Sequence, residues 1–505
     1  MMLVIVFGAS FMAYNLEAFS SDPLSVFGES TAKNKHYLME QMIHKLRLDV
    51  PPPIRYFIWL RGLVAGLWGH FDLGKTRENL PVIDAIGLAI PTTFRLVIAS
   101  TILAIVLGIT IGMITAIRQY SRFDYVMTFI SFLLFSLPVF WVAVLLKEYV
   151  AIDFNDFLAN PEIPIHLILI FGLLGGLIMA GILGGSRTRF WSTFAGVSAG
   201  FSGLLWYASV THWFVTPGLG VVGVGLIAFV SAVVVTQIST GLENRKSLIS
   251  ALAAAAVITA AYYPLQGLMN AKANLLTVVA IFALTLGVSA AIGFFVDKID
   301  RGINIRSAIL TALLGTLPLL LDRYMQEFNR YMNSDAIGGR PVPTIGERQE
   351  LLSKGQAHNF WVTGLDAGMH LILPTMALTL ISFAGYVRFS RGSLLEVLNM
   401  DYIRTARAKG LTERTVIVRH AMRNAMLPLT TILVNDFAGV IGGAIITERV
   451  FGWEGMGKLF NSALSNYDLN LFMGVFIISA VLTVMANLIA DLLFGVVDPR
   501  IRIRK

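Results

Sequence analysis

Runs of apolar residues long enough to cross a lipid bilayer dominate this chain of 505 residues. A membrane-crossing helix needs roughly 20 mostly apolar residues. The chain is 56% hydrophobic and only 14% charged, whereas soluble domains carry roughly 25% charged residues. We therefore predict an all-α polytopic membrane protein. About twelve runs meet the length requirement: 1–18, 90–116, 126–150, 166–184, 190–210, 218–238, 247–266, 275–296, 305–321, 370–387, 428–447 and 471–496.

Composition excludes several other classes of protein. The chain has no cysteine, which excludes disulfides, thiolate metal sites and cysteine nucleophiles. Its net charge of +8 is typical of membrane proteins whose Lys and Arg gather in cytoplasmic loops, so we expect no nucleic-acid partner. The first run has no basic residue ahead of it and no cleavage site behind it, which favours a short or clipped helix over a signal peptide. We predict no cofactor, metal site or catalytic residue.

Basic residues in the short connections predict the orientation. If the N-terminus is cytoplasmic, the Arg- and Lys-bearing connections all fall on the cytoplasmic side, and the outer turns after the fifth and seventh runs carry only Lys272. We expect a multi-pass protein of the cell (plasma or inner) membrane with both termini cytoplasmic and residues 19–89 outside. The basic connections are 118–122, 187–189, 245–246, 298–306 and 388–424.

The stretch GHFDLGKT, residues 69–76, fits the phosphate-loop pattern G-x-x-x-x-G-K-[ST]. A working phosphate loop needs a buried strand before it and a helix whose N-terminus faces the phosphates. An amphipathic helical run precedes Gly69, Pro81 soon interrupts the residues after Thr76, and the topology places the stretch outside. We therefore expect no nucleotide binding here, although a membrane nucleotide hydrolase is the function that these residues alone would support.

Residues 388–428 are too polar to cross a bilayer, yet they are strongly helical apart from Gly410. Glycine favours a left-handed helix end, and Thr412 can cap a following helix. The pattern predicts a helix, a turn and a second helix at the cytoplasmic face. An amphipathic surface helix whose arginines touch anionic lipid is the alternative.

Within this segment, DYIRTARAKGL and RHAMRNAMLPL resemble the cytoplasmic signature of ATP-binding-cassette (ABC) importer permeases of the dipeptide, oligopeptide and nickel family. IPTTFRLVIAS, SLPVFWVAVLL and NLIADLLFGVVDPRIR resemble other parts of the same permeases. The resemblance implies a coupling helix that docks in a cleft of an ATPase subunit. Small residues at Ala406 and Ala408 would let a partner approach closely, and arginines can bind its carboxylates. The matching residues are Tyr402, Arg404, Thr405, Ala406, Arg407, Ala408, Lys409, Gly410, Leu411, Arg419 and Arg423.

A second stretch, ITERVFGWEGMGKLFNSALSNYDLNL, resembles the family's extracellular loop that contacts the substrate-binding protein. The residues carried over are Glu448, Phe451, Trp453, Gly455 and Gly457.

The family's type I importer core has six transmembrane helices, so the resemblance implies that about six more are inserted. We expect residues 1–158 to form the N-terminal half of the core, with three spans and the extracellular segment 19–89, and residues 366–505 the C-terminal half with the coupling helix. Residues 159–365 would be an inserted transmembrane region and a peripheral scaffold beside the core. Glycine pairs there allow close helix contact, or arise by chance in a Gly-rich segment: Gly172/Gly176, Gly181/Gly185 and Gly196/Gly200.

The resemblance implies a permease subunit of an ATP-driven importer of di- or oligopeptides. Its partners would be a related second permease, two ATPase subunits and an extracellular binding protein. The chain itself is not an enzyme, because it lacks a Walker B acid after a buried strand and an ABC signature.

Asp436, in an apolar run, is a candidate translocation-path residue or a structural partner for another helix. Nickel, opines or oligosaccharides remain alternative substrates. An ion-coupled secondary transporter, which would need several mid-membrane charges, is the alternative from another class.

Overall fold

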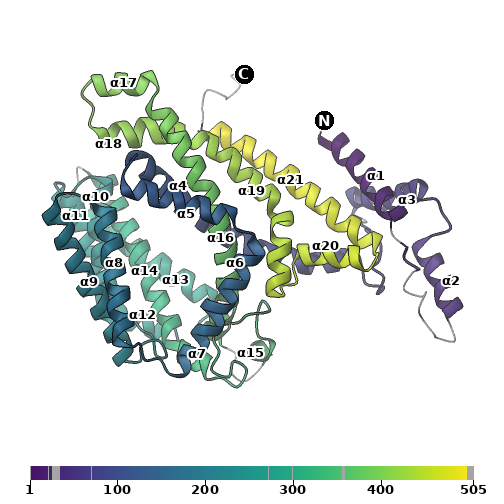
Figure 1. Ribbon diagram of the computed structural model, residues 1–505, viewed down its shortest axis with the longest axis horizontal. Helices are drawn as coiled ribbons and strands as arrows, with labels where there is room; N and C mark the ends of the chain where they lie inside the picture. Colours follow the sequence, from purple (N-terminus) through teal and green to yellow (C-terminus); the bar gives the residue numbers. More distant parts are fainter. Residues whose placement is uncertain are drawn as a thin grey trace. The chain divides into compact units, whose positions relative to one another are not determined.

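A computed structural model describes residues 2–20, 22–24, 35–69, 71–270, 272–297, 300–354 and 359–497. Helices dominate these ranges, in which the sole strand-like pairing is an isolated bridge between Lys75 and Pro81. The fold class predicted from the apolar runs, an all-α polytopic membrane protein, is confirmed. Figure 1 shows the helices in chain order.

The chain divides into two compact units. The first comprises Met1–Glu148, Thr344–Glu347 and Leu371–Lys505, and the second comprises Tyr149–Pro343 and Arg348–His370. Two helices, η3 (Leu146–Ile152) and α16 (Phe360–Leu398), run from one unit into the other. The first unit also holds α1 (Met2–Ser20), α2 (Lys35–Leu46), α3 (Pro52–Ala65), η2 (Gly66–Trp68), α4 (Val82–Ile117), α5 (Arg122–Ser136), α6 (Val139–Leu145), α17 (Asp401–Ala408), α18 (Glu413–Thr415), η4 (Val416–Ala421), α19 (Met422–Phe451), α20 (Met456–Ser465) and α21 (Leu469–Val497).

The second unit is built mainly from long apolar helices joined by short turns. Its helices are α7 (Asp153–Ala159), α8 (Ile165–Leu183), α9 (Arg187–Val210), α10 (Gly220–Ser239), α11 (Arg245–Ala260), α12 (Tyr262–Leu268), α13 (Leu275–Val296), α14 (Arg301–Met332) and α15 (Glu350–Lys354).

Each predicted apolar run lies on a helix, but not every run is one straight span. Seven helices of the described chain are long and apolar enough to cross a membrane by themselves, or up to nine if each bent pair counts as one span. The number twelve therefore stays a prediction.

The run 126–150 is bent by 104° between α5 and the helices after it. Leu137 is extended, at φ −85° and ψ 132°, because the ring of Pro138 disfavours a helical residue before it.

In the first unit, α4 packs on α16 through glycines that face the second helix directly. A Cβ atom on Gly108 would lie 2.5 Å from the Cβ of Tyr386, and one on Gly112 would lie 1.9 Å from Ser390 Oγ. Ser390 Oγ in turn donates to the carbonyl of Gly108 at 3.3 Å. This small-residue spacing brings the backbones of α4 and α16 close together.

In the second unit, one of the three predicted glycine pairs makes a helix contact. A Cβ on Gly172 would lie 1.8 Å from Ser202 Oγ, and one on Gly176 would lie 2.0 Å from Ser198 Oγ, so α8 and α9 meet here. The other two pairs do not form such contacts among the described residues. Space is open around Gly181, Gly196 and Gly200, and Gly185 has a positive φ of 107° after the end of α8. Spacing alone therefore did not identify the contact face.

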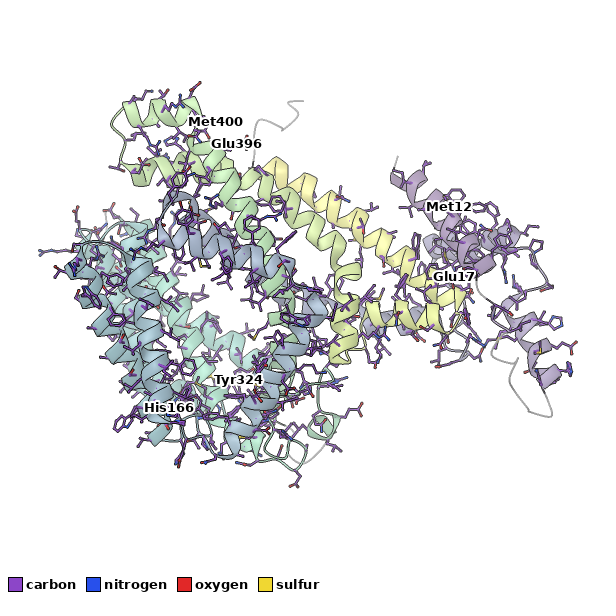
Figure 2. All side chains as sticks on the ribbon, viewed as in Figure 1. Met12, Glu17, His166, Tyr324, Glu396 and Met400 are labelled. Carbon is purple, nitrogen blue, oxygen red and sulfur yellow. The ribbon has the colours of Figure 1, made fainter. Side chains whose placement is uncertain are left out.

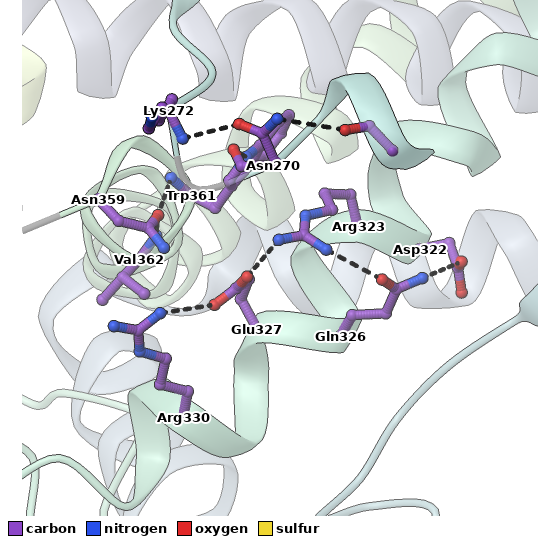
Figure 3. A network of polar contacts seen from close by, with 11 residues as sticks. Asn270, Lys272, Asp322, Arg323, Gln326, Glu327, Arg330, Asn359, Trp361 and Val362 are labelled. Atoms are coloured by element: carbon purple, nitrogen blue, oxygen red, sulfur yellow. Dashed lines mark hydrogen bonds and ion pairs between the residues drawn. The ribbon is translucent and has the colours of Figure 1, made fainter. Parts of the chain in front are cut away.

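A buried carboxylate, Asp322, organises the end of α14 that the predicted run 305–321 left out. Its Oδ1 accepts hydrogen bonds from the backbone N–H groups of Leu219 (2.6 Å) and Gly220 (3.0 Å), where α10 begins. Its Oδ2 accepts from Tyr262 Oη at 2.5 Å and from Gln326 Nε2 at 2.8 Å. Figure 3 shows this end of α14 with its neighbouring charges. Asp322 thus caps the N-terminus of a different helix, α10. Its carboxylate can be fully buried because both of its oxygens accept hydrogen bonds.

Candidate functional site

The segment from the end of α16 to the start of α19 forms the predicted helix, turn and second helix. Glu396 and Met400, labelled in Figure 2, lie where α16 ends and α17 approaches. α17 ends at Ala408, and Gly410 has a φ of +75°. The side chain of Thr412 accepts a hydrogen bond from the N–H of Thr415 and caps α18. This local structure, predicted from Gly410 and Thr412, is confirmed.

One face of α17 is anchored in the interior of the first unit. Ile403 is fully buried and Ala406 is 8% exposed. The apolar cluster around them draws residues from α4, α16, η4 and α19, so α17 is tied to three long helices at once. The other buried members of the cluster are Met113, Ala116, Leu394, Val397, Val416, Ala421 and Ala425.

Ala406 and Ala408, for which the sequence predicts the same role, differ in their exposure to solvent. Ala406 packs inward in this cluster, so its small size serves the protein's own packing. Ala408 is exposed, so the room that its small side chain would leave for a partner stays a prediction. The remaining exposed residues of the predicted docking set are Tyr402, Arg404, Thr405, Arg407, Lys409, Gly410, Leu411, Arg419 and Arg423.

Two ion pairs lie on the exposed face of this segment. Arg407 forms a two-pronged pair with Glu413 across the Gly410 turn, with Nε–Oε2 at 3.1 Å and Nη2–Oε1 at 2.6 Å. The hydrogen bond from Arg407 lowers the pKa of Glu413, and the bond to Glu413 raises the pKa of Arg407. Arg404 lies 3.6 Å from the carboxylate of Asp401 and stays largely exposed. The Arg407–Glu413 pair therefore joins the two sides of the turn, while the Arg404 side chain stays exposed.

Two polar contacts join the segment to α19. The Nδ2 of Asn424 donates to Tyr402 Oη at 2.6 Å, and Ser393 Oγ donates to the carbonyl of Ala425 at 2.8 Å. Together with the apolar cluster, they make α17 and the adjoining ends of α16 and α19 a single packed structure.

An ion pair that the sequence did not reveal connects the first basic turn to α16. Arg391 holds Asp124 with two bonds, Nε–Oδ1 at 2.8 Å and Nη2–Oδ2 at 3.0 Å. Burial acts to raise the pKa of Asp124, but hydrogen bonds from Arg391 and the N–H of Tyr120, with the arginine's charge, outweigh burial and lower it. The Ser121-x-x-Asp124 spacing is a capping signal for α5. Nothing local, however, points to a partner 267 residues away.

The residues predicted to contact a binding protein form a tightly packed corner between α19 and α20. Glu448 is fully buried; its Oε1 accepts from Thr93 Oγ1 at 2.6 Å and its Oε2 from the N–H of Lys458 at 3.0 Å. A Cβ on Gly455 would lie 2.3 Å from Glu448 Oε1, and one on Gly457 would lie 2.5 Å from the Cα of Ile445. These glycines are needed for close approach.

The aromatic members of that set, Phe451 and Trp453, are each 2% exposed. Their side chains therefore shape the corner, and a partner would meet exposed neighbours such as Glu454. Contact with a binding protein stays a prediction. Asp436 lies on α19, and its side chain is outside the described residues, so its role also stays a prediction.

GHFDLGKT has the surroundings of a surface turn. The helices α3 and η2 come before it, and α4 begins only at Val82. Gly74 has a φ of +84°, and the Lys75 carbonyl accepts a hydrogen bond from Asn470 Nδ2 at 3.0 Å. His70 lies outside the described residues. The described part of this stretch lacks the strand, loop and helix order of a phosphate loop.

Comparisons with known proteins point to one family. Residues 283–503 match the family described as "Binding-protein-dependent transport system inner membrane component". The match begins inside the predicted insertion of 159–365.

Curated permeases are similar to part of the chain. It is 48% identical over 132 residues to the oligopeptide transport system permease protein AppB of Bacillus subtilis, covering 26% of this chain and 42% of that protein. It is 46% identical over 151 residues to the dipeptide transport system permease protein DppB of Escherichia coli, covering 30% and 43%. It is 38% identical over 151 residues to the oligopeptide transport system permease protein OppB of Mycobacterium tuberculosis, covering 30% and 46%. The chain thus spans less than half the length of these relatives in the matched segments.

Proposed function

We propose, from the match of residues 283–503 to the family described as binding-protein-dependent transport system inner membrane component, that this chain is the membrane-spanning permease subunit of an ATP-driven importer. Its substrates would be di- or oligopeptides handed over by a binding protein, as the names of the similar permeases suggest. One structural observation carries the proposal. One face of α17 is basic and exposed, while the opposite face packs against residues of α4, α16, η4 and α19.

This arrangement suits the transmission of force. A partner that pulls on α17 must move the buried Ile403 and Ala406, and with them the cluster formed by α4, α16, η4 and α19. Packed interiors move as bodies because they deform little. The Arg391–Asp124 pair extends the same connection to the start of α5. Closure of a docked ATPase would therefore move several membrane-spanning helices together.

The partners follow from the same proposal. We expect two ATPase subunits to hydrolyse ATP, a related second permease to complete the pore, and an extracellular binding protein to supply substrate. Both termini would be cytoplasmic. Residues 159–365 would be an inserted scaffold without transport chemistry of its own, which is supported by the internal pairing of Asp322 with backbone and side-chain donors.

The absence of cysteine allows a clean test of docking. In otherwise cysteine-free protein, Ala408→Cys places a thiol on the exposed face of α17, and Ala406→Cys places a matched thiol two residues away in the buried cluster. In membrane vesicles, a maleimide should label Ala408→Cys and leave Ala406→Cys unlabelled. Co-expression with the cognate ATPase subunits should protect Ala408→Cys from the reagent.

Two further measurements separate the parts of the proposal. Arg404→Glu should reduce co-purification of the ATPase subunits and uptake of labelled peptides together. Labelling of Ala408→Cys that the ATPases leave unchanged would refute docking at α17. Normal docking with uptake of nickel or an oligosaccharide in place of peptides would refute only the substrate class. Proton- or sodium-driven uptake by the isolated chain would support the secondary-transporter alternative instead.

A further inference from the structure

The first unit contains a cavity of about 270 Å³ whose walls are strongly basic. It is formed by the end of α1, the turn after α2, one face of α3, the GKT turn and the start of α21. Four cationic residues line it, Lys45, Arg47, Arg55 and Lys75, together with a single carboxylate, Asp72, among the described residues. The Oδ1 of Asp72 already accepts a hydrogen bond from the N–H of Gly74 at 2.8 Å. The cavity therefore carries an excess of positive charge.

Arg55 is the most informative residue of this lining. It is 8% exposed, and its Nη1 has one long hydrogen bond, 3.4 Å to the carbonyl of Leu46. Its buried Nε has no hydrogen-bond partner among the described residues. A guanidinium presents five donors, and burial without acceptors is costly. An anion in the cavity would supply the missing acceptor.

The other three cations of the lining are more exposed than Arg55. Lys45, Arg47 and Lys75 are exposed. The Nζ of Lys45 donates to the carbonyl of Arg77 at 2.8 Å, which holds this lysine in place beside the GKT turn. The backbone of that turn is pinned by Asn470 at the start of α21. The cationic lining is therefore attached to a fixed frame.

The cavity also has the apolar and aromatic walls of a membrane boundary. Ala18 in the last turn of α1 and Leu469 at the first residue of α21 both line it, so it lies where two apolar helices end. Tyr14 and Trp59 form part of the wall, and such residues are enriched where lipid headgroups meet water. The cationic lining complements the negative charge of a phospholipid headgroup phosphate.

We propose that this cavity binds a phosphate oxyanion, either the headgroup phosphate of an anionic phospholipid or free phosphate. Arg55 would bind the oxyanion with its fork of donors, and Lys75 would add positive charge. The site does not depend on the proposed transport function. It also gives the GKT turn a role that needs no phosphate loop.

The test uses the purified full-length chain in a neutral detergent, stripped of lipid. Thermal unfolding is followed during titration with short-chain phosphatidylglycerol, with phosphatidylcholine of the same chain length, and with inorganic phosphate. Lys75→Gln and Arg55→Gln remove charge from the cavity. Arg61→Gln removes the same charge from an exposed position of α3 that does not line it.

We expect saturable stabilisation by phosphatidylglycerol and none by phosphatidylcholine, with the affinity reduced about tenfold in Lys75→Gln and Arg55→Gln and unchanged in Arg61→Gln. Stabilisation by inorganic phosphate with the same dependence on the variants identifies free phosphate as a ligand. If neither anion binds, or if all three variants bind equally well, the proposal is wrong. Lys75→Gln alters an exposed side chain, so it decides the question even if Arg55→Gln does not fold.

Discussion

Gly112→Ala should push α4 and α16 slightly apart and so lower the free energy of unfolding. The added Cβ would lie 1.9 Å from Ser390 Oγ and 2.6 Å from the carbonyl oxygen of Val387. Rotation of the serine can relieve the first contact, but the second is with backbone. The helices must therefore move apart by about 0.8 Å to reach the 3.4 Å of an ordinary contact. Overpacking of this kind costs up to about 3 kcal/mol, offset by about 1 kcal/mol of helix propensity, which leaves about 2 kcal/mol of destabilisation.

Gly87→Ala on the same helix is the matched control. Nothing lies within 4 Å of a Cβ at Gly87, so this variant should gain the roughly 1 kcal/mol of helix propensity without strain. The two variants should differ by about 3 kcal/mol. SDS titration of the purified chain, followed by tryptophan fluorescence, measures that difference.

A second variant checks the cause. Ser390→Ala in the Gly112→Ala background removes the hydroxyl contact and leaves the contact with the Val387 carbonyl, so it should restore stability only in part. Equal stability of Gly112→Ala and Gly87→Ala would refute the reasoning, since the close approach would then be of no energetic consequence.

Arg391→Gln should cost about 2 kcal/mol at pH 7, because it leaves a buried carboxylate without its charged partner. The Arg391 side chain is 28% exposed, so the cost stays below the roughly 3–5 kcal/mol of a fully buried pair. The folded-state pKa of Asp124 is lowered, so the stability from this pair is present above the unfolded pKa of about 4 and is lost as the pH falls through the folded value. The variant's unfolding midpoint should therefore vary less with pH in acid, and an unchanged pH profile would contradict this. Gly410→Ala should cost about 1 kcal/mol from its φ of +75°, whereas Gly392→Ala in α16 should not destabilise; equal midpoints would contradict the strain. Glu413→Gln should change stability by less than about 1 kcal/mol, because the pair is exposed, and a larger shift in the same titration would show that the turn depends on it.

Local signals in the sequence were sufficient to predict the helices and the helix, turn and second helix of residues 388–428. Apolar runs place helices because a bilayer leaves backbone groups no partner other than their own helix. Gly410 and Thr412 predict a turn and a cap because both effects act within a few residues. The bend before Pro138 follows from a local rule too, but an unbroken apolar run concealed it.

Contacts between distant segments were beyond the reach of such signals. Gly172/Gly176 and Gly196/Gly200 have the same spacing, yet the first pair meets a second helix and the second pair faces open space. The spacing of two glycines predicts that a second helix could approach closely, but it does not show whether a second helix lies there. Burial of Glu448 and of the corner it holds likewise depends on Thr93, which lies on another helix.

The amino-acid sequence by itself determined that this chain is a bundle of membrane helices with a polar helix–turn–helix segment, because hydropathy and turn chemistry act over one helix length. Tertiary structure alone decided which faces of those helices meet. It turned Ala406 inward and Ala408 outward, paired Arg391 with Asp124, and gathered cations around Arg55. Those choices depend on which side chains from distant segments complement one another in shape and charge, and that complementarity exists only once the chain has folded.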